Sequence, residues 1–239
     1  MYWVERVPYH IKKIYNMKKT KSSTPQILLD VLDYLKTNKL VAEAKVNGEG
    51  RMASLKDEET IIEFLKKSKK FSKYVIEVEA RKAGDFYLLD YDKVTIHIMN
   101  IKTTKGSTDN ATCKIGFLWA FTDMELDELP GNITLKIWNN LMKKRKANIP
   151  NRDYWYLTFD KRDMSKVFLR GAKQIVNWKY NPSNFLQIDW KMEWETKEQF
   201  YSFDESYSNI MDGMKECIRK KLVNSYPIDW VKQIAKTIK

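Results

Sequence analysis

The chain has few residues of the two types that build cysteine- and histidine-based sites: two cysteines and two histidines among 239 residues. Cys113 and Cys217 lie far apart and no CxxC pair occurs, which excludes a zinc ribbon or a zinc finger. His10 and His97 are too few for sites with several imidazole ligands, and for nuclease classes built on two or more catalytic histidines. Any metal chemistry must therefore use oxygen ligands, which suit Mg²⁺ better than Zn²⁺.

Glycine and proline are also scarce, at 8 and 6 residues, which excludes a collagenous or low-complexity chain. No apolar run approaches the roughly 20 residues of a membrane span, and the N-terminal segment lacks the apolar stretch of a signal peptide. Hydrophobic residues make up 43% and aromatic residues 13% of the chain, which excludes a disordered protein. We therefore expect a folded, intracellular protein of the cytoplasm with no membrane partner.

Acidic residues are outnumbered, since 31 Asp and Glu against 43 Lys and Arg give a net charge of +12. Such an excess favours a polyanionic partner, with nucleic acid ahead of an anionic membrane surface. Lysines cluster in the N-terminal arm and in two runs, Lys66–Lys73 and Lys143–Lys146, which suit phosphate contacts or equally form a solvated face. The charge alone thus leaves open a basic protein without a nucleic-acid partner.

Hydrophobic periodicity predicts one α/β domain with helical additions. Apolar residues at helical spacing predict helices over 25–38, 111–123, 132–147 and 203–221, a helix that opens at Ser54, and a last amphipathic piece from Ile228. Alternating or continuous apolar runs predict strands over 74–80, 85–89, 93–103, 154–160, 167–169 and 186–190, with turns at 90–92 and 181–182. Trp119, Trp155 and Trp190 lie within these periodic segments, which predicts that they belong to the core.

The strands predicted over 85–89 and 93–103 bring chemically useful side chains together. In a hairpin, Asp85 lies across from residues 98–100. Asn100 and Lys102 are two positions apart on one strand and project from the same face, whereas His97 lies on the opposite face and is expected to be structural. An acid, an amide carbonyl and an ammonium group converge, and this set suits phosphodiester cleavage. A carboxylate holds Mg²⁺, and a nearby lysine stabilises the developing negative charge.

Four short segments carry a family resemblance. They are Gly50–Ser54 followed by Glu58-Glu59 and Ile61-Ile62, then Asp85 with Asn100-Ile101-Lys102-Thr103-Thr104, then Asp109-Asn110-Ala111, and finally Asn181-Pro182 with Gln187 and Trp190. In this order they resemble type II restriction endonucleases of the PD-(D/E)XK nuclease superfamily. The resemblance covers roughly residues 48–225, and the order of the segments is more specific than any single one.

The resemblance implies an α/β fold with a PD-(D/E)XK-type core, in which helices flank a mixed β-sheet, and additional helical elements. It implies a Mg²⁺-dependent, sequence-specific endonuclease that cuts double-stranded DNA, leaves 5′-phosphate and 3′-hydroxyl ends, and works as a homodimer. The chain is then a single endonuclease domain over 1–239. It comprises a basic N-terminal arm and helix over 1–47, a catalytic core over 48–125, and elements for sheet completion, DNA binding or dimerisation over 126–239.

The same resemblance implies roles for individual residues. Asp85 matches the first acid, which ligates Mg²⁺, and Lys102 matches the catalytic lysine. Asn100 stands where a second acid is usual, and the main-chain carbonyl of Ile101 also reaches the metal.

Asn100 departs from the family's pattern, because a neutral amide cannot supply the negative charge of an aspartate. Glu59, or its neighbour Glu58, matches an auxiliary acid on the preceding helix. We hypothesise that Glu77 and Glu79, on the neighbouring strand, restore charge at the site.

Candidate DNA contacts are the polar residues near these motifs and in the second basic run: Arg51, Thr103, Thr104, Lys105, Ser107, Asn110, Lys143 and Lys144. Two alternative functions stay open. One is a catalytically weak or inactive DNA-binding protein on a nuclease-like fold, which Asn100 supports; metal-dependent nicking of plasmid DNA separates it from an enzyme. The other is a non-specific repair or recombination nuclease, which would give a smear in place of discrete fragments.

Overall fold

The structure is a computed structural model that describes residues 23–38, 50–78, 83–104, 114–126, 128–129, 140–141, 146–181 and 185–225. Within these ranges the side chains at 50–56, 114, 185 and 222–225 lie outside the description. None of the described helices is long and apolar enough to cross a membrane.

A five-stranded mixed sheet, in the order β1-β2-β3-β4-β5, forms the centre of the fold. Its strands are β1 (Val75–Glu77), β2 (Phe86–Leu89), β3 (Ile96–Thr104), β4 (Tyr154–Asp160) and β5 (Asp163–Gly171). Neighbouring strands are antiparallel except for β3 and β4, which run parallel with Asn100 opposite Tyr156 and Lys102 opposite Thr158. The connection between the two parallel strands includes α3 (Lys114–Phe121).

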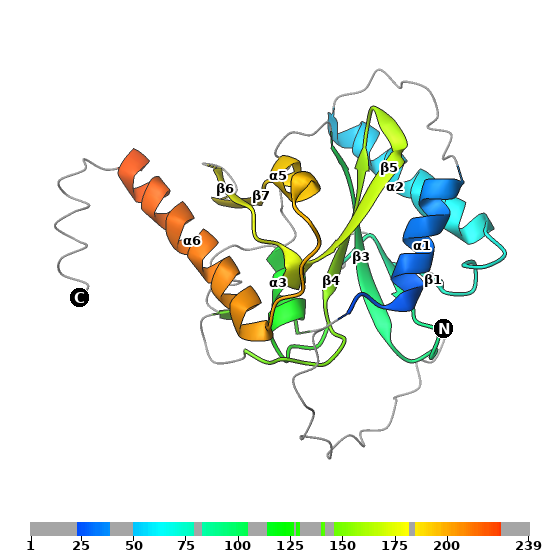
Figure 1. Cartoon of the computed structure of the whole chain (residues 1–239), viewed down its shortest axis with the longest axis horizontal. Coiled ribbons are helices and arrows are strands. Elements are labelled where there is room, and N and C mark those ends of the chain that lie inside the picture. Colours follow the sequence, from blue (N-terminus) through cyan, green and yellow to red (C-terminus); the bar gives the residue numbers. More distant parts are fainter. Residues whose placement is uncertain are drawn as a thin grey trace, which may run out of the picture.

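Helices cover both faces of this sheet (Figure 1). One face, which we call the α2 face, carries Met99 and Ile101 and packs against α1 (Gln26–Thr37) and α2 (Gly50–Lys67). The other, which we call the α3 face, carries Ile98 and packs against α3. Beyond α3 lie a second, two-stranded sheet, a short 3₁₀ turn and two further helices. Their bounds are β6 (Trp178–Asn181), β7 (Phe185–Ile188), η1 (Ala172–Gln174), α5 (Trp190–Glu195) and α6 (Phe203–Ser225).

The expected class of fold, a mixed sheet flanked by helices, is confirmed. The strand predicted over 154–160 matches β4, all seven residues of which are buried. The helices predicted over 25–38 and 203–221 match α1 and α6 closely, whereas α2 begins at residue 50, earlier than the predicted start at Ser54. The prediction for 228 onwards lies outside the described residues, as does the helix over 132–147 except for residues 140–141 and 146–147.

One prediction of local structure was wrong, and one strand was missed. Residues 186–190 were expected to form one strand, but β7 ends at Ile188 and Trp190 begins α5, because the Asp189 side chain accepts a hydrogen bond from the Met192 N–H and caps the helix. The strand β6 precedes the turn predicted at 181–182 and had not been recognised. Trp155 and Trp190 are buried as predicted, at 4% and 0% exposure.

Candidate functional site

Asp85 is attached to β3 by both its backbone and its side chain. It immediately precedes β2, and its N–H donates to the Met99 carbonyl at 2.8 Å. Its carboxylate Oδ2 accepts a hydrogen bond from the Ile101 N–H at 2.6 Å. The hairpin register, with Phe86 opposite Met99, therefore brings Asp85 beside Asn100, as the sequence predicts.

This close approach depends on Gly84. A Cβ atom at residue 84 would lie 2.6 Å from Ile98 Cγ2 and 2.7 Å from the Met99 carbonyl oxygen. Contacts below 3.0 Å force neighbouring atoms to move, and here one of those atoms belongs to the backbone of β3. The glycine thus allows the chain to deliver Asp85 against the strand.

Asn100 and Lys102 lie on the α3 face of β3, on the same side as Ile98, because side chains alternate along a strand. Asn100 is 5% exposed, and its Oδ1 atom has no hydrogen-bond partner among the described residues. Lys102 is half-buried. Its neighbour on β4, Thr158, is fully buried and its hydroxyl also lacks a partner within the described part of the chain. A polar strip therefore interrupts an otherwise apolar sheet face.

Burial and charge act in opposite directions on the carboxyl group of Asp85. Burial raises its pKa above the ordinary aspartate value, while the positive charge of Lys102 and the hydrogen bond from Ile101 act to lower it. The register agrees with this influence, because Asp85 lies beside Asn100 and Lys102 follows two residues later on the same face of β3. The net direction is upward, so a further cation near Asp85 would favour its ionised form.

The donor set at this strip consists of oxygen atoms, which fits Mg²⁺. The ligands would be the Asp85 carboxylate, the Asn100 Oδ1 and the Ile101 carbonyl. The Ile101 carbonyl points to the Asp85 side of β3, because the N–H of the same residue already bonds Asp85 there. The described residues contain no cluster of three or more His, Cys, Asp or Glu side chains that could hold a metal, so binding would rest on a single carboxylate with neutral oxygens.

The expected auxiliary acid does not join this strip. Glu59 is exposed on α2, and the structure shows no hydrogen bond or ion pair between it and Asp85, Asn100 or Lys102. Since Ile61 packs into the core of the α2 face, α2 lies on the side of the sheet opposite Asn100. Glu58 is half-buried on the same helix.

The hypothesis that Glu77 restores charge at the site is wrong for geometric reasons. Glu77 lies opposite Phe86, and its side chain therefore points to the α2 face, away from Asn100. It forms an ion pair with Lys66 of α2 instead. Glu79 lies outside the described residues.

The candidate DNA contacts fall into two groups. Thr103 and Thr104 at the end of β3 are buried, at 6% and 1% exposure, and offer little surface to a ligand. The others have side chains outside the described part: Arg51, Lys105, Ser107, Asn110, Lys143 and Lys144.

Two lysines of the run Lys66–Lys73 are paired with acids. Lys66 contacts Glu63 at 3.2 Å as well as Glu77, and Lys70 lies 2.8 Å from Asp30. The Lys70 hydrogen bond is the largest of the causes that lower the pKa of Asp30 to about 2. Two of the five lysines of this run therefore balance acidic side chains of the protein itself.

His97 is structural, as its place on the opposite face predicts. It is 1% exposed on the α2 face, and its Nε2 atom lies 2.9 Å from Asp90 Oδ2. The contact ties β3 to the turn that joins it to β2.

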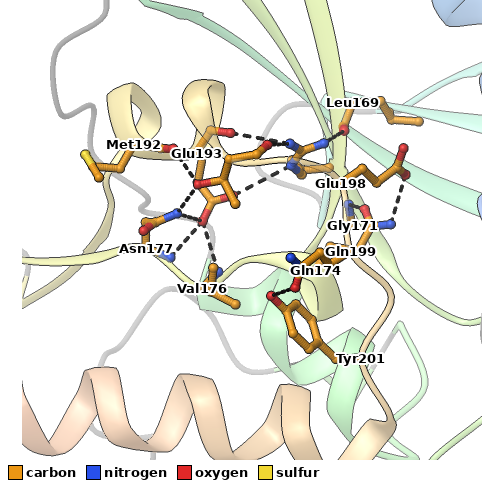
Figure 2. Close-up of polar contacts among 12 residues, drawn as sticks. Leu169, Gly171, Gln174, Val176, Asn177, Met192, Glu193, Glu198, Gln199 and Tyr201 are labelled. Atoms are coloured by element: carbon orange, nitrogen blue, oxygen red, sulfur yellow. Dashed lines mark hydrogen bonds and ion pairs between the residues drawn. The ribbon is translucent and has the colours of Figure 1, made fainter.

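Sequence reasoning missed a buried ion pair between Arg170 of β5 and Glu193 of α5, whose facing atoms, Nε and Oε2, are 3.6 Å apart. Figure 2 shows the Glu193 carboxylate facing the loop before β6. Its Oε1 accepts hydrogen bonds from the Val176 N–H and from the backbone and side-chain amides of Asn177, at 2.7–2.9 Å. The Arg170 guanidinium donates to the Thr196 carbonyl at 2.5 Å. This network joins α5 to the main sheet. The sequence carries no signal for it, because Arg170 and Glu193 are 23 residues apart and neither stands in a distinctive motif.

Comparison of the chain with protein-family models, with curated proteins and with solved structures finds no match in any of the three. What can be said about function therefore depends on the site itself.

Proposed function

We propose that this protein is a Mg²⁺-dependent DNA endonuclease that resembles type II restriction endonucleases, with Asp85, Asn100 and Lys102 at its reacting centre. The observation that carries the proposal is the 2.6 Å hydrogen bond from the Ile101 N–H to the Asp85 carboxylate. This contact holds an acid at the start of β2 against β3, which carries a lysine 17 positions further along the chain. The buried side-chain oxygen of Asn100, two residues before Lys102 on the same strand, has no hydrogen-bond partner among the described residues. The net charge of +12 suits a polyanionic substrate.

Asp85, the Asn100 side-chain oxygen and the Ile101 carbonyl would hold Mg²⁺. When bound, the metal ion polarises a phosphoryl oxygen and acidifies a coordinated water molecule. Lys102, a half-buried residue on the same face as Asn100, would stabilise with its ammonium the negative charge that develops on the phosphate. A homodimer, which would present two such centres to the two strands of DNA, belongs to the same proposal.

Digestion of mixed plasmid DNA tests the proposal, with Mg²⁺ in one arm and EDTA in the other. We expect Mg²⁺-dependent cleavage that falls by about 100-fold or more in Lys102→Ala, because a charge-stabilising donor is lost. Lys215→Ala is the matched control, since Lys215 lies exposed on α6, paired with Asp212, and its loss should leave cleavage unchanged. Discrete fragments would indicate a site-specific enzyme, and a smear would indicate the non-specific nuclease.

Asn100→Asp addresses the alternative of an inactive DNA-binding protein. A second carboxylate should strengthen Mg²⁺ binding and raise cleavage at low Mg²⁺ concentration. Tight DNA binding without cleavage, in both the wild type and Asn100→Asp, would instead favour the non-catalytic protein.

A further inference from the structure

The turn between β4 and β5 carries an arginine that its surroundings hold in one orientation. Arg162 donates from Nε to Asp160 Oδ1 at 2.9 Å and from Nη2 to Asp160 Oδ2 at 2.7 Å, which is a two-pronged guanidinium–carboxylate pair. The Arg162 N–H also donates to Asp160 Oδ1, at 2.9 Å. The Asp160 side chain is only 11% exposed, whereas that of Arg162 is 66% exposed. The carboxylate is thus largely buried within the fold, whereas the guanidinium side chain is exposed to solvent.

This turn lies next to the end of the strand that carries the proposed reacting centre. Asp160 is in register with Thr104, two residues beyond Lys102 on β3, and the Lys161 N–H donates to the Thr104 carbonyl at 2.9 Å. A separation of one strand and two residues corresponds to about 8 Å between the Cα atoms of Lys102 and Asp160. Consecutive phosphates of one DNA strand are about 7 Å apart in space, of which about 3.4 Å is advance along the duplex axis, so a group at this distance can reach the phosphate next to one held at Lys102.

We propose that Arg162, oriented by Asp160, binds a backbone phosphate of duplex DNA next to the one at the reacting centre. The pair with Asp160 occupies two of the five N–H donors of the guanidinium, and three remain for a second anion. Because Asp160 already fixes the long side chain, little conformational entropy is lost when a phosphate binds. Lys166, 62% exposed on β5, lies 3.7 Å from Asp163 and is therefore paired with an acid of the same strand, so the proposed contact depends on Arg162 alone. The inference rests on the proposed function for the identity of the ligand.

A second arginine of the chain provides a matched control. Arg219 on α6 forms the same two-pronged pair, with Nε and Nη2 each 2.8 Å from the Glu216 carboxylate, and its side chain is 61% exposed. It differs in position, since α6 packs against β6, β7 and η1 and lies on the left of Figure 1, away from the β4–β5 turn. Its carboxylate partner is more exposed than Asp160, at 46% against 11%, but the two arginines have the same charge and pairing and nearly the same exposure. Arg219 thus separates a phosphate contact from the general effect of removing one positive charge.

The experiment measures the affinity for a 30-base-pair duplex in EDTA, at a series of salt concentrations, so that binding is separated from cleavage. In Arg162→Gln we expect affinity to fall by about 3- to 10-fold and the slope of log K against log salt to decrease in magnitude by about 1, the loss of one phosphate contact. Arg162→Lys keeps the charge and should keep the slope. Arg219→Gln should leave the slope unchanged.

Equal changes in Arg162→Gln and Arg219→Gln, or no change in either, would overturn the assignment. A lower melting temperature in both Arg162 variants with an unchanged slope would mean that the pair only locks the turn, which also overturns it. If the wild type binds duplex DNA but never cleaves it, the endonuclease proposal fails while the slope still decides the role of Arg162. If the wild type does not bind duplex DNA at all, both the endonuclease proposal and the role of Arg162 are overturned.

Discussion

Replacement of Glu193 by Gln should strongly destabilise the protein, although the two side chains have nearly the same shape. Glu193 is 0% exposed, and its Oε1 atom accepts three N–H groups of Val176 and Asn177. A glutamine oxygen can still accept these bonds, but each changes from a charge-assisted to a neutral hydrogen bond and becomes weaker. The glutamine amide would also direct a donor at the Nε–H of Arg170, which is itself buried.

The size of this effect follows from the burial of both partners. Removal of one member of a buried ion pair costs about 3–5 kcal/mol, because the remaining charge is left without its partner in a medium of low polarity. We expect the lower end, about 3 kcal/mol, since the Arg170 guanidinium keeps the Leu169, Glu193 and Thr196 carbonyls as acceptors. For a chain of this length, such a loss corresponds to a melting temperature lower by about 6–12 °C.

Urea unfolding followed by tryptophan fluorescence would measure the loss, with Glu216→Gln as the control. Glu216 also pairs with an arginine, but its side chain is 46% exposed, so its replacement should leave the stability nearly unchanged. A double-mutant cycle with Arg170→Met should give a coupling energy of about 1–3 kcal/mol. Equal costs for the two glutamines would refute the reasoning, since burial would then make no difference.

Two further predictions concern the neighbourhood of β3 and β4. Gly84→Ala should displace the chain at Asp85 by steric conflict with β3, cost about 1–3 kcal/mol of stability, and lower any Mg²⁺-dependent cleavage by 10-fold or more; unchanged stability and cleavage would contradict the close approach at residue 84. Burial raises the pKa of Asp153 from 3.8 to about 6. The folded state therefore favours the protonated carboxyl group, and the contribution of Asp153 to stability is greatest below about pH 4 and declines by about 3 kcal/mol as the pH rises through 6. The asparagine in the variant Asp153→Asn does not titrate, so the stability of the wild type relative to the variant should fall between pH 4 and pH 7 in urea titrations. A stability difference that stays constant over this range would refute the raised pKa of Asp153.

The parts of the fold that the sequence predicts are those in which one local pattern decides the outcome. Strand β4 carries apolar side chains on both faces over residues 154–157 and could be predicted to the residue, because it is buried on both sides of the sheet. Strand β5 was expected only over 167–169 but extends over Asp163–Gly171. Its first four residues are half-buried or exposed and carry no apolar pattern, while Arg170 and Gly171 extend the strand by pairing with β4. Strand β6 carries no such pattern: its four residues are partly exposed, and pairing with β7 alone makes them a strand.

The candidate site divides in the same way. The proximity of Asp85 to Asn100 and Lys102 follows from the register of a hairpin and from alternation along one strand, which are both local. The position of Glu59 depends on which face of the sheet its helix covers, and spacing along the chain does not determine that. The Arg170–Glu193 pair likewise depends on how α5 packs against β5, a tertiary contact between two charges that look ordinary in the sequence.

The arrangement of charge is more informative about a DNA partner than its sum. The net charge of +12 suggested the basic run Lys66–Lys73, yet Lys66 and Lys70 there are paired with acids on neighbouring elements. Arg162 is also paired, but the pair leaves donors facing solvent beside the end of β3. A net positive charge attracts DNA from a distance, whereas a contact at the reacting centre needs donors that are already oriented when the phosphate arrives. The salt dependence of single variants separates these two effects. Loss of a phosphate contact lowers the number of counterions released on binding, and with it the slope of log K against log salt, whereas a change in distant charge does not.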